Sequence, residues 1–455
     1  MAGTEGTSLI VTFVNICILL LKIQSFFLSQ LISRFLGIDI TIKSSETNLK
    51  DRSHNQDILE LVKSKGYIVR EFVVTTKDGY LLVLHKIERP GRSQYLHNGK
   101  IAYFHHGLLT NSELFVLGTK KEKNLPFLLL DLDYEVWLGN NRGNKYSRKH
   151  LNLSVCDVKF WDFSLDEYAY YDIPDSLSFI RSFYRPEDKI TYIGFSQGCS
   201  QLFASLSLKP EVNNYLNLFV GLSPALIPKD LNHPVFKIIS NQAAKDNAFL
   251  YSLFGRRAIM PSVSFWFEVL GVDMYKKVVD KSLVYLFGWS GKNIDDEQKS
   301  LGYPHMFSNS SVKSITHWFQ IISSKRFQMF DETGTLGLTR LSGVFDASKS
   351  KSHRVTPFPI AHHLNTRMLL FYGDQDILVS IDRAQQLILD HNEKMQNKLE
   401  VVLCKGYEHM DTLWGNNVYE DVFSKVVNRM ESLHNKKVPF TDDLITPING
   451  SLKKL

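Results

Sequence analysis

The sequence contains few cysteines, and none of them lies in a metal-binding pattern. Only four occur in 455 residues, with no CxxC pair and no Cys/His cluster at the spacing of metal ligands. They are Cys17, Cys156, Cys199 and Cys404. This spacing argues against a structural metal site and predicts free thiols in a reducing compartment.

The chain also lacks a concentrated block of positive charge. Its net charge of +6 is spread along the sequence, and charged residues make up 22% of it. Nucleic acid is therefore not expected as a partner. Internal repeats and low-complexity tracts are absent too, and the hydrophobic content of 44% allows one large core or two modest ones.

No uninterrupted apolar run reaches the about 20 residues that span a bilayer. Near the N-terminus, however, Leu9 to Leu21 is mostly apolar, and after Lys22 a second apolar stretch runs from Ile23 to Ile38. A basic leader and a small-residue cleavage site are missing, so removal as a signal peptide is not expected. A single span or a hairpin in one leaflet fits if Lys22 snorkels or the second stretch contributes. We expect a membrane anchor here, with a buried soluble helix as the alternative.

The basic residues around this segment predict its orientation. Lys22, Arg34, Lys43 and Lys50 all lie on its C-terminal side. The positive-inside rule then places the rest of the chain in the cytoplasm, in agreement with the prediction of free thiols.

Beyond a polar linker, short β-rich runs alternate with longer helical patterns. A hairpin is expected from Tyr67–Thr75 and Tyr80–Lys86, which flank a Lys-Asp-Gly turn. Six further strands are predicted at Ile101–Phe104, Tyr134–Leu138, Ile190–Ile193, Leu218–Leu222, Met368–Tyr372 and Leu399–Leu403. Such alternation is typical of a largely parallel, doubly wound α/β sheet with helices on both faces.

The alternation is interrupted between about Pro224 and Pro359, which favours an inserted, mostly helical cap domain. The predicted organisation is a membrane anchor (1–38), a polar linker (39–56), a first core part (57–223), the cap or lid insertion (224–359), a second core part (360–433) and a polar C-terminal tail (434–455). The core is thus expected to be built from two separated stretches of chain.

The segment Gly194-Phe195-Ser196-Gln197-Gly198 stands where a β-rich run ends and helical spacing begins. A G-x-S-x-G pattern in this position is typical of a nucleophile elbow, in which a strained turn exposes the serine hydroxyl. Only small neighbours fit there, which explains the two glycines. We expect Ser196 to be a catalytic nucleophile, with an ordinary glycine-rich turn as the alternative.

A serine nucleophile needs a base, and the base needs a carboxylate that fixes its tautomer. After such an elbow, the chain order is serine, acid, histidine. Asp376 follows the predicted strand at Met368–Tyr372 and is the expected acid; Asp374 is the alternative, since one residue of register decides which carboxylate faces the imidazole. His409 stands on a loop after the last predicted strand and is the expected base.

An oxyanion hole requires two backbone N–H donors. Gln197, which follows the nucleophile, is expected to supply one, and Leu108, just after the first predicted parallel strand, is expected to supply the other. His105 and His106 as metal ligands form a competing interpretation. Adjacent side chains of an extended segment are expected to diverge, however, and no further ligands support it. Neither a metal nor a cofactor is expected.

These motifs together resemble the acid lipase family, which includes gastric and lysosomal acid lipases and, closer in architecture, fungal membrane-anchored steryl ester hydrolases. The resemblance runs from about Asp57 to Val427. It rests on segments beginning at Gly66 (GYIVREFVVTTKDGYLLVLHKI), His105 (HHGLLTNS), Tyr134 (YEVWLGNNRGNKYSRKH), Phe160 (FWDFSLDEYAYYDIP), Gly194 (GFSQG), Ser314 (SITHWFQIISSKRFQMFD), Gly373 (GDQDILV) and Gly406 (GYEHMDTLWG). Secreted and lysosomal members begin with a cleavable signal, so the cytosol-facing, lipid-storage branch is the closer analogy.

The resemblance implies an α/β-hydrolase fold with a cap over the active site. It implies that Ser196, Asp376 and His409 form a triad and that Leu108 and Gln197 are the oxyanion donors. Apolar cap side chains are candidates for lining an acyl or sterol tunnel, with a role in the cap's own core as the alternative. They are Phe265, Trp266, Phe267, Leu270, Tyr285, Phe287, Trp289, Trp318 and Phe319.

The expected function is serine-dependent hydrolysis of carboxylic esters of neutral lipids, with steryl esters as the favoured substrates. The alternatives are a triacylglycerol lipase, a sterol or lipid acyltransferase using the same triad, and an inactive binding protein at lipid droplets. The expected partners are a neutral lipid ester and the surface of a membrane or lipid droplet. The resemblance and the anchor together predict an endoplasmic reticulum or lipid-droplet location with the catalytic domain facing the cytoplasm.

Overall fold

The computed structural model describes residues 56–91, 98–229, 239–241, 247–259, 263–332 and 355–434. The predicted anchor and almost all of the predicted linker and tail lie outside these ranges. The chain divides into two units, residues 1–53 and 54–455, and the second contains every described residue. Across the described ranges, no helix combines the length and apolar character needed to cross a bilayer.

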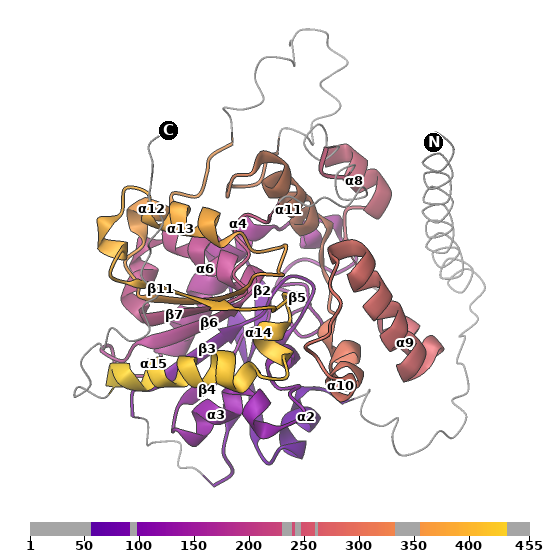
Figure 1. The fold of residues 1–455 in the computed structure, drawn as a ribbon. Helices are drawn as coiled ribbons and strands as arrows, with labels where there is room; N and C mark the ends of the chain where they lie inside the picture. The colour runs from indigo at the N-terminus through magenta and orange to yellow at the C-terminus, as the bar shows by residue number, and fades with distance from the viewer. Residues whose placement is uncertain are drawn as a thin grey trace, which may run out of the picture. The chain divides into compact units, whose positions relative to one another are not determined.

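A nine-stranded mixed sheet forms the centre of the fold (Figure 1). Its order is β1 (Ile68–Thr75), β2 (Tyr80–Glu88), β4 (Glu135–Leu138), β3 (Ile101–His105), β6 (Ile190–Phe195), β7 (Leu216–Leu222), β10 (Met368–Gly373) and β11 (Leu399–Cys404), with β5 (Lys149–His150) paired to β2. Strand β2 pairs in an antiparallel sense with β1, β4 and β5. The neighbouring strands in the series β4, β3, β6, β7, β10 and β11 pair in parallel. The prediction of a largely parallel α/β sheet is confirmed.

The first two strands form the predicted hairpin. Their register pairs Ile68 with Glu88 and Thr75 with Leu81. Gly79 adopts φ +97° in the connecting turn, a conformation that L side chains rarely take. The Lys-Asp-Gly signal therefore corresponds to the turn that sets this register.

Helices cover both faces of the sheet (Figure 1). One face packs against α5 (Ile173–Arg181), α6 (Gln197–Leu208) and α13 (Ile381–Leu389), and the other against α2 (Ile58–Ser64), α3 (Leu125–Asp131) and α15 (Ser424–His434). Along β10, Leu370 enters the first core, and Leu369 and Phe371 enter the second. Because both faces are buried, the parallel strands appear in the sequence as continuous apolar runs.

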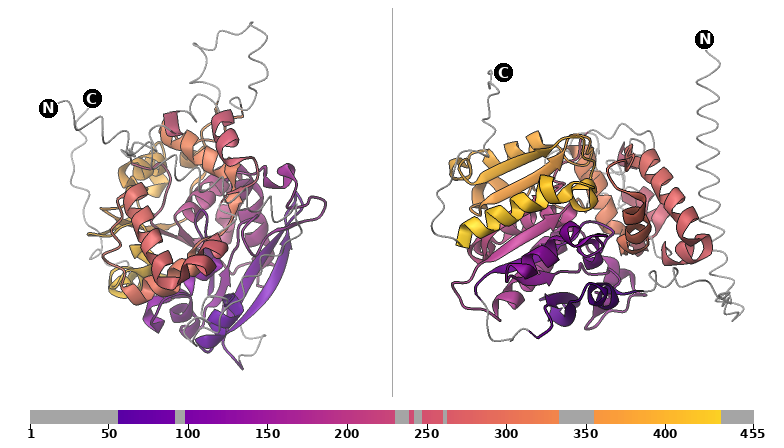
Figure 2. Two further views of the ribbon diagram at one scale, coloured as in Figure 1. Left: turned by 90° about the vertical axis from the view of Figure 1, so that its right-hand side faces the viewer. Right: turned by 60° about the horizontal axis from the view of Figure 1, so that its bottom comes forward.

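The chain between β7 and β10 is mainly helical in its described part. It contains α8 (Asn247–Phe254), α9 (Val263–Phe287), α10 (Asp296–Met306), α11 (Val312–Ser324), α12 (Ile360–His363) and a small sheet of β8 (Ala258–Ile259) and β9 (Ser310–Ser311). The helices α9 and α10 lie together beside the main sheet (Figure 1 and Figure 2). We call the described part of residues 224–359 the cap, which leaves α12 in the core, and these bounds stay a prediction.

Capping side chains mark where two of these cap helices begin. The Asp295 carboxylate accepts a hydrogen bond from the N–H of Gln298 (2.7 Å) at the start of α10. The Ser311 hydroxyl accepts one from the N–H of Ser314 (2.9 Å) at the start of α11. Each cap satisfies a backbone donor that the first helical turn leaves without a partner.

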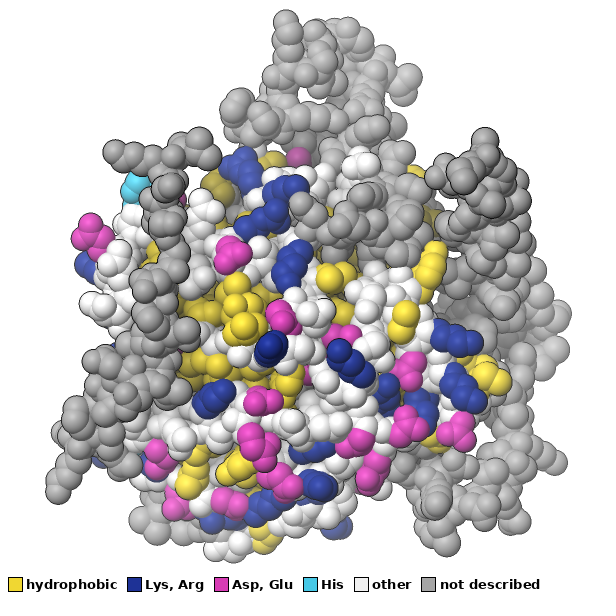
Figure 3. Space-filling view, in the orientation of Figure 1, with side chains coloured by type: hydrophobic (Ala, Val, Ile, Leu, Met, Phe, Trp, Pro, Cys, Tyr) yellow, Lys and Arg dark blue, Asp and Glu magenta, His cyan; other side chains and the backbone are white. Residues whose placement is uncertain are grey.

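The surface of the described fold carries charges of both signs. Figure 3 shows lysine and arginine side chains interspersed with aspartate and glutamate over one face. Some of them pair, such as Lys276 with Asp296 at 3.1 Å on neighbouring cap helices. Positive side chains are therefore not gathered in one patch on this face.

The three cysteines within the described ranges are free thiols, as predicted. Cys156 is exposed, whereas Cys199 and Cys404 are buried. Cys17 lies outside the described residues.

Candidate active site

Ser196 occupies the sharp turn between β6 and α6. Its backbone has φ 54° and ψ −119°, a left-handed conformation that costs a residue with a side chain about 1–3 kcal/mol. Two backbone hydrogen bonds hold the turn: the Ser196 N–H donates to the carbonyl of Leu222, and the Cys199 N–H donates to the carbonyl of Ser196, both at 3.0 Å. The sheet and the helix therefore fix the strained conformation together.

The two glycines that flank this turn are required by close packing. A Cβ atom at Gly198 would lie 2.3 Å from the carbonyl oxygen of His105, and one at Gly194 would lie 2.9 Å from the backbone nitrogen of Cys199. Side chains do not fit at such distances without movement of the backbone. The glycine spacing that predicted the elbow thus follows from the approach of α6 to β3 and β6.

The structure brings Ser196, His409 and Asp376 into one hydrogen-bonded chain. Nε2 of His409 lies 2.8 Å from Oγ of Ser196, and Nδ1 lies 2.7 Å from Oδ2 of Asp376. The exposed fractions are 9% for Ser196, 4% for His409 and 0% for Asp376. An ionised carboxylate only accepts, so Nδ1–H donates to Asp376 and Nε2 is left to accept the serine proton.

Of the two aspartates after β10, only Asp376 contacts the histidine. Its other oxygen accepts a hydrogen bond from the N–H of Leu378 at 2.9 Å, which fixes the orientation of the carboxylate. Asp374 instead accepts from the N–H of Gly406 at 2.7 Å and is exposed. Asp374 therefore joins the loop after β10 to the loop after β11.

Both predicted oxyanion donors belong to segments that lie against Ser196. Gln197 is the first residue of α6, where backbone N–H groups have no helical partner. A Cβ at Gly107 would lie 3.0 Å from Cβ of Ser196, so the loop that continues to the half-buried Leu108 passes directly beside this serine. Their role as donors stays a prediction.

The rings of His105 and His106 do not diverge as expected. They lie nearly parallel, 11° apart, with centroids separated by 5.4 Å. Asn141 holds both: its side-chain oxygen lies 2.8 Å from Nε2 of His105, and its N–H donates to Nε2 of His106 at 3.1 Å. The expectation failed because this buried network overrides the alternation of an extended segment.

Burial favours the neutral form of both histidines. Nδ1 of His106 donates to the carbonyl of Gly107 (2.8 Å), and Nδ1 of His105 lies 2.8 Å from the hydroxyl of Tyr103. Burial lowers the pKa of His105 to about 4 and the pKa of His106 to about 3. All four ring nitrogens are occupied by protein groups, and His106 directly supports the loop beside Ser196.

The cap reaches the elbow through one tryptophan. The indole N–H of Trp318, on α11, donates to Oε1 of Gln197 at 2.6 Å, and both side chains are buried. Nε2 of Gln197 has no hydrogen-bond partner among the described residues. Gln197, the residue after Ser196, is thus held by the cap as well as by the core.

A second cap tryptophan covers the histidine. The indole of Trp289 stacks on the imidazole of His409 with centroids 5.2 Å apart and planes 5° apart, and Phe287 stacks on Trp289 in turn. Phe195 lies against the imidazole at 5.1 Å with a tilted ring. Sequence reasoning named Trp289 only as one of many tunnel candidates, because no pattern shows which cap aromatic reaches the histidine.

The other tunnel candidates differ in their burial. Trp318 and Phe319 are buried, whereas Tyr285 is 52% exposed on α9. The side chains of Phe265 and Trp266 lie outside the described residues. The candidates therefore do not form one uniformly buried set.

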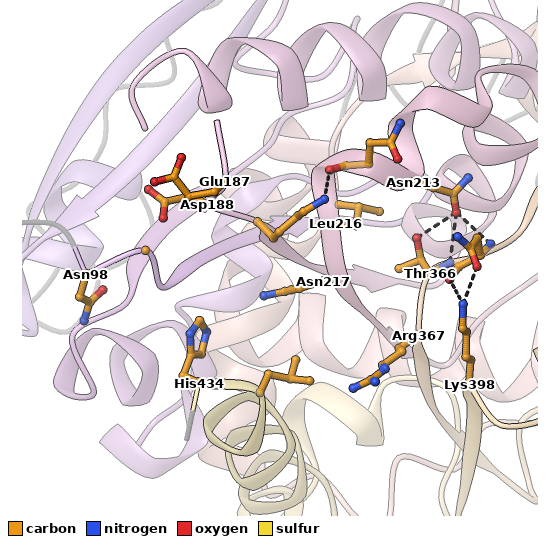
Figure 4. Close-up of a pocket in the computed structure, with 15 residues that line it drawn as sticks. Asn98, Glu187, Asp188, Asn213, Leu216, Asn217, Thr366, Arg367, Lys398 and His434 are labelled. Atoms are coloured by element: carbon orange, nitrogen blue, oxygen red, sulfur yellow. Dashed lines mark hydrogen bonds between the residues drawn. The ribbon is translucent and has the colours of Figure 1, made fainter. Parts of the chain in front are cut away.

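A polar cavity of about 620 Å³ lies at the amino-terminal ends of the parallel strands (Figure 4). Its lining includes Lys189, Arg367 and Lys398, which directly precede β6, β10 and β11. In Figure 4 the amide oxygen of Asn213 accepts a hydrogen bond from the Thr366 hydroxyl (3.0 Å). Ser196, Asp376 and His409 all follow the carboxyl ends of parallel strands, where such sheets place ligands, so this cavity is separate from the candidate active site.

Two family profiles match the chain. The profile described as "Partial alpha/beta-hydrolase lipase region" matches residues 58–119, and the profile described as "alpha/beta hydrolase fold" matches residues 103–415. The second match covers more than half of the chain and contains all of the candidate site residues.

Several curated proteins are similar over most of their length. A "Probable lipase" of Schizosaccharomyces pombe is 41% identical over 376 residues, which are 83% of this chain and 80% of that protein. The human "Lysosomal acid lipase/cholesteryl ester hydrolase" is 28% identical over 418 residues, covering 87% of this chain and 98% of its own. A crystal structure from Sulfolobus solfataricus covers 81% of this chain and 95% of its own with a TM-score of 0.52 and 13% identity, a likeness of fold alone.

Proposed function

The chain belongs to the acid lipase family of α/β-hydrolases, and from this premise we propose that it hydrolyses neutral lipid esters through a covalent acyl-enzyme on Ser196. Membership of this family makes it a carboxylic ester hydrolase. The observation that carries the serine mechanism is the hydrogen-bonded chain from Ser196 through His409 to Asp376.

In the first half-reaction, the hydroxyl of Ser196 attacks the ester carbonyl. Nε2 of His409 takes the serine proton as the new C–O bond forms, and the carboxylate of Asp376 stabilises the resulting imidazolium. His409 then gives this proton to the departing alcohol oxygen, and the acyl group stays on Ser196 as an ester. In the second half-reaction, a water molecule attacks the acyl-enzyme and gives a proton to Nε2 of His409. The bond from the acyl carbon to Oγ then breaks, His409 returns the proton to Oγ of Ser196, and the fatty acid is released.

Negative charge develops on the carbonyl oxygen in each tetrahedral intermediate. The N–H groups of Gln197 and Leu108 are proposed to donate to it, since both belong to segments that lie beside Ser196. A preorganised pair of donors needs no rearrangement during the reaction, and loss of one donor costs about 100- to 1,000-fold in kcat in comparable sites. The site uses no metal and no cofactor in this scheme.

Steryl esters are the proposed substrates, and triacylglycerols are the second candidates. A human relative carries cholesteryl ester hydrolase in its name, which favours the first class. The apolar side chains of Phe195, Trp289 and Trp318 around the site support a water-insoluble substrate. Alcohols in place of water would make the same scheme an acyl transfer.

Residues 1–38 are proposed to hold the enzyme at the endoplasmic reticulum or lipid-droplet surface, with the catalytic domain in the cytoplasm. The support is the pair of apolar stretches flanked by basic residues on the C-terminal side. Alkaline extraction of membranes tests this proposal. The full chain should stay in the pellet and a chain without residues 1–38 should be released, whereas release of both would contradict it.

The hydrolysis proposal is tested with purified protein and two emulsified substrates, cholesteryl oleate and trioleoylglycerol. The expected result is fatty acid release from both, faster from the steryl ester. Ser196→Ala should lower kcat by at least about 10,000-fold, because the residual rate then comes only from binding and the oxyanion donors. Retained activity in that variant would contradict a serine mechanism, and release from trioleoylglycerol alone would contradict the substrate assignment.

A further inference from the structure

A loop of the cap is hydrogen-bonded to Glu408, the residue before the candidate catalytic histidine. This loop, residues 288–294 between α9 and α10, is called the cap loop below. The carboxylate of Glu408 accepts hydrogen bonds from the N–H of Ser290 (2.8 Å), the hydroxyl of Ser290 (2.9 Å) and the N–H of Gly291 (2.8 Å). Glu408 is only 7% exposed, so these contacts replace most of its hydration.

A second set of hydrogen bonds joins the cap loop to the segment around His409. The amide of Asn293 donates to the carbonyl of Gly406 (2.8 Å) and to the carboxylate of Asp411 (2.7 Å), which also accepts from the N–H of Glu408 (2.7 Å). The N–H of Asn416 donates to the carbonyl of Asn293 at 2.8 Å. The cap loop is therefore joined to the chain on both sides of His409.

These contacts place Trp289 on the imidazole. Trp289 directly precedes Ser290, so the hydrogen bonds to Glu408 position the residue whose indole stacks on His409. The indole is 8% exposed and lies almost parallel to the imidazole. A parallel aromatic ring limits rotation of the imidazole and stabilises a positive charge that develops on it.

We propose that Glu408 and Trp289 are positioning residues for His409, and that the cap loop is a fixed part of the catalytic site. This inference rests on the proposed serine mechanism, which it extends to the cap. Glu408 holds the cap loop through its backbone, and Trp289 holds the imidazole in line between Ser196 and Asp376.

The reason for a catalytic effect is geometric. His409 must face Ser196 and Asp376 at once, and its ring can turn about its side-chain bonds when nothing packs on it. A misplacement of about 1 Å in a reacting group can cost about 100-fold in rate. Loss of Trp289, or of the hydrogen bonds between Glu408 and the cap loop, is therefore expected to lower kcat and not to raise KM.

The test compares four variants of the full chain: Glu408→Gln, Trp289→Leu, Trp289→Phe and Gln298→Met. Glutamine keeps the size of Glu408 but removes its charge and turns an amide N–H₂ toward one of the backbone donors. Gln298 is the matched control, since it is buried and joins α10 to the core through Thr119 (3.1 Å) and Leu117 (2.9 Å). The substrate is p-nitrophenyl butyrate, whose short chain makes little use of a lipid site.

Glu408→Gln and Trp289→Leu are each expected to lower kcat by about 10- to 100-fold with KM changed less than about threefold. The rate constant for labelling Ser196 with a fluorophosphonate should fall in the same proportion. Trp289→Phe should recover most of the lost kcat because it restores an aromatic face, and Gln298→Met should leave kcat within about twofold. The double variant Glu408→Gln/Trp289→Leu should be no slower than the slower single variant, since both act through one stacked pair.

Several results would overturn the inference. Full kcat in both Glu408→Gln and Trp289→Leu would show that His409 needs no support from the cap loop. Equal losses in Glu408→Gln and Gln298→Met would assign the effect to general loosening of the cap, and a rise in KM alone would assign it to substrate binding. Should Trp289→Leu fail to fold, the contrast between Glu408→Gln and Gln298→Met decides. Activity in Ser196→Ala would instead overturn the proposed function, so the two failures are distinguishable.

Discussion

The core and the cap both contact the candidate active site, but they hold it by different means. In the core, Ser196, Asp376 and His409 follow strands β6, β10 and β11, whose backbones pair in parallel with their neighbours. In the cap, Trp289 and Trp318 reach the same site through side chains and a few loop contacts. Backbone pairing therefore fixes where these three residues lie, and the proposed role of the cap contacts is to align their side chains.

Replacement of the two aspartates after β10 gives the largest expected difference within the core. Asp376→Asn should lower kcat by about 10,000-fold, because an amide in place of the carboxylate favours the wrong imidazole tautomer. Asp374→Asn is the control, since that side chain contacts the N–H of Gly406 and not the imidazole. It should keep kcat within about threefold, and steady-state kinetics on a soluble ester measures both.

Equal losses of kcat in the two aspartate variants would contradict the proposal that Asp376, and not Asp374, orients the imidazole. A loss confined to Asp374→Asn would reverse the assignment of the acid.

A smaller effect is expected from Gly107→Ala. The added methyl group would lie 3.0 Å from Cβ of Ser196, so the loop must shift by a few tenths of an ångström and carry Leu108 with it. Displacement of one oxyanion donor should lower kcat by about 10- to 100-fold, less than its removal. Kinetics and a thermal melt measure the effect together, and an unchanged kcat in a stable protein would show that this loop does not bear on the acyl-transfer step.

The smallest effect is expected at the contact between Asp166 of the core and Phe330 of the cap. The carboxylate of Asp166 accepts a hydrogen bond from the N–H of Phe330 (2.9 Å), and its other oxygen has no hydrogen-bond partner in the described part of the chain. Burial raises the pKa of Asp166 to about 7, with Glu167 and Glu332 adding to the rise and the Phe330 hydrogen bond and Lys313 opposing it. Its carboxylate form is therefore disfavoured in the folded protein.

The sign of the pH effect follows from this raised pKa. In the unfolded chain the pKa of an aspartate is near 4, so between about pH 4 and pH 7 the folded protein binds more protons at Asp166. The free energy of unfolding must then fall as the pH rises through this window. Asp166→Asn removes the titration, and it should raise stability at about pH 8 by roughly 1 to 2 kcal/mol while leaving it unchanged at about pH 4.

Thermal melts at the two pH values measure this difference. Because Asp166 forms no hydrogen bond with Ser196, His409 or Asp376, kcat of the variant should stay within about twofold. If Asp166→Asn has the same pH dependence of stability as the parent, the assignment of a raised pKa to Asp166 is contradicted. A large loss of kcat would extend the catalytic role of the cap beyond the cap loop.

The core could be predicted from the sequence because its strands and its turn at Ser196 each depend on a short stretch of residues. Strand β10 is apolar on both faces, so it appears as a continuous run, and the turn at Ser196 demands glycines at fixed positions. The expected order of serine, acid and histidine along the chain led to the prediction of Asp376 and His409, and the structure joins both to Ser196 through hydrogen bonds. One residue of register remained open between Asp374 and Asp376, because only the hydrogen bonds of the folded loop separate them.

The cap contacts could not be predicted because no repeating sequence pattern determines how the chain folds in the cap. Trp289 is one of several cap aromatics, and nothing in its neighbourhood indicates a stack on His409. Glu408 stands in the recognised motif around His409, yet its partners Ser290 and Gly291 are more than 100 residues away. Similarly, the parallel rings of His105 and His106 depend on Asn141, a contact that only the folded sheet creates.

The decisive measurement is the trapping of the acyl-enzyme. The full chain is mixed with p-nitrophenyl butyrate, quenched in acid within the first turnover, digested and examined by mass spectrometry, with Ser196→Ala treated in parallel. We predict a burst of p-nitrophenol stoichiometric with the protein and a butyryl group on the peptide that contains Ser196, both absent from the variant. Steady turnover with no burst and no acylated Ser196 would contradict the serine mechanism.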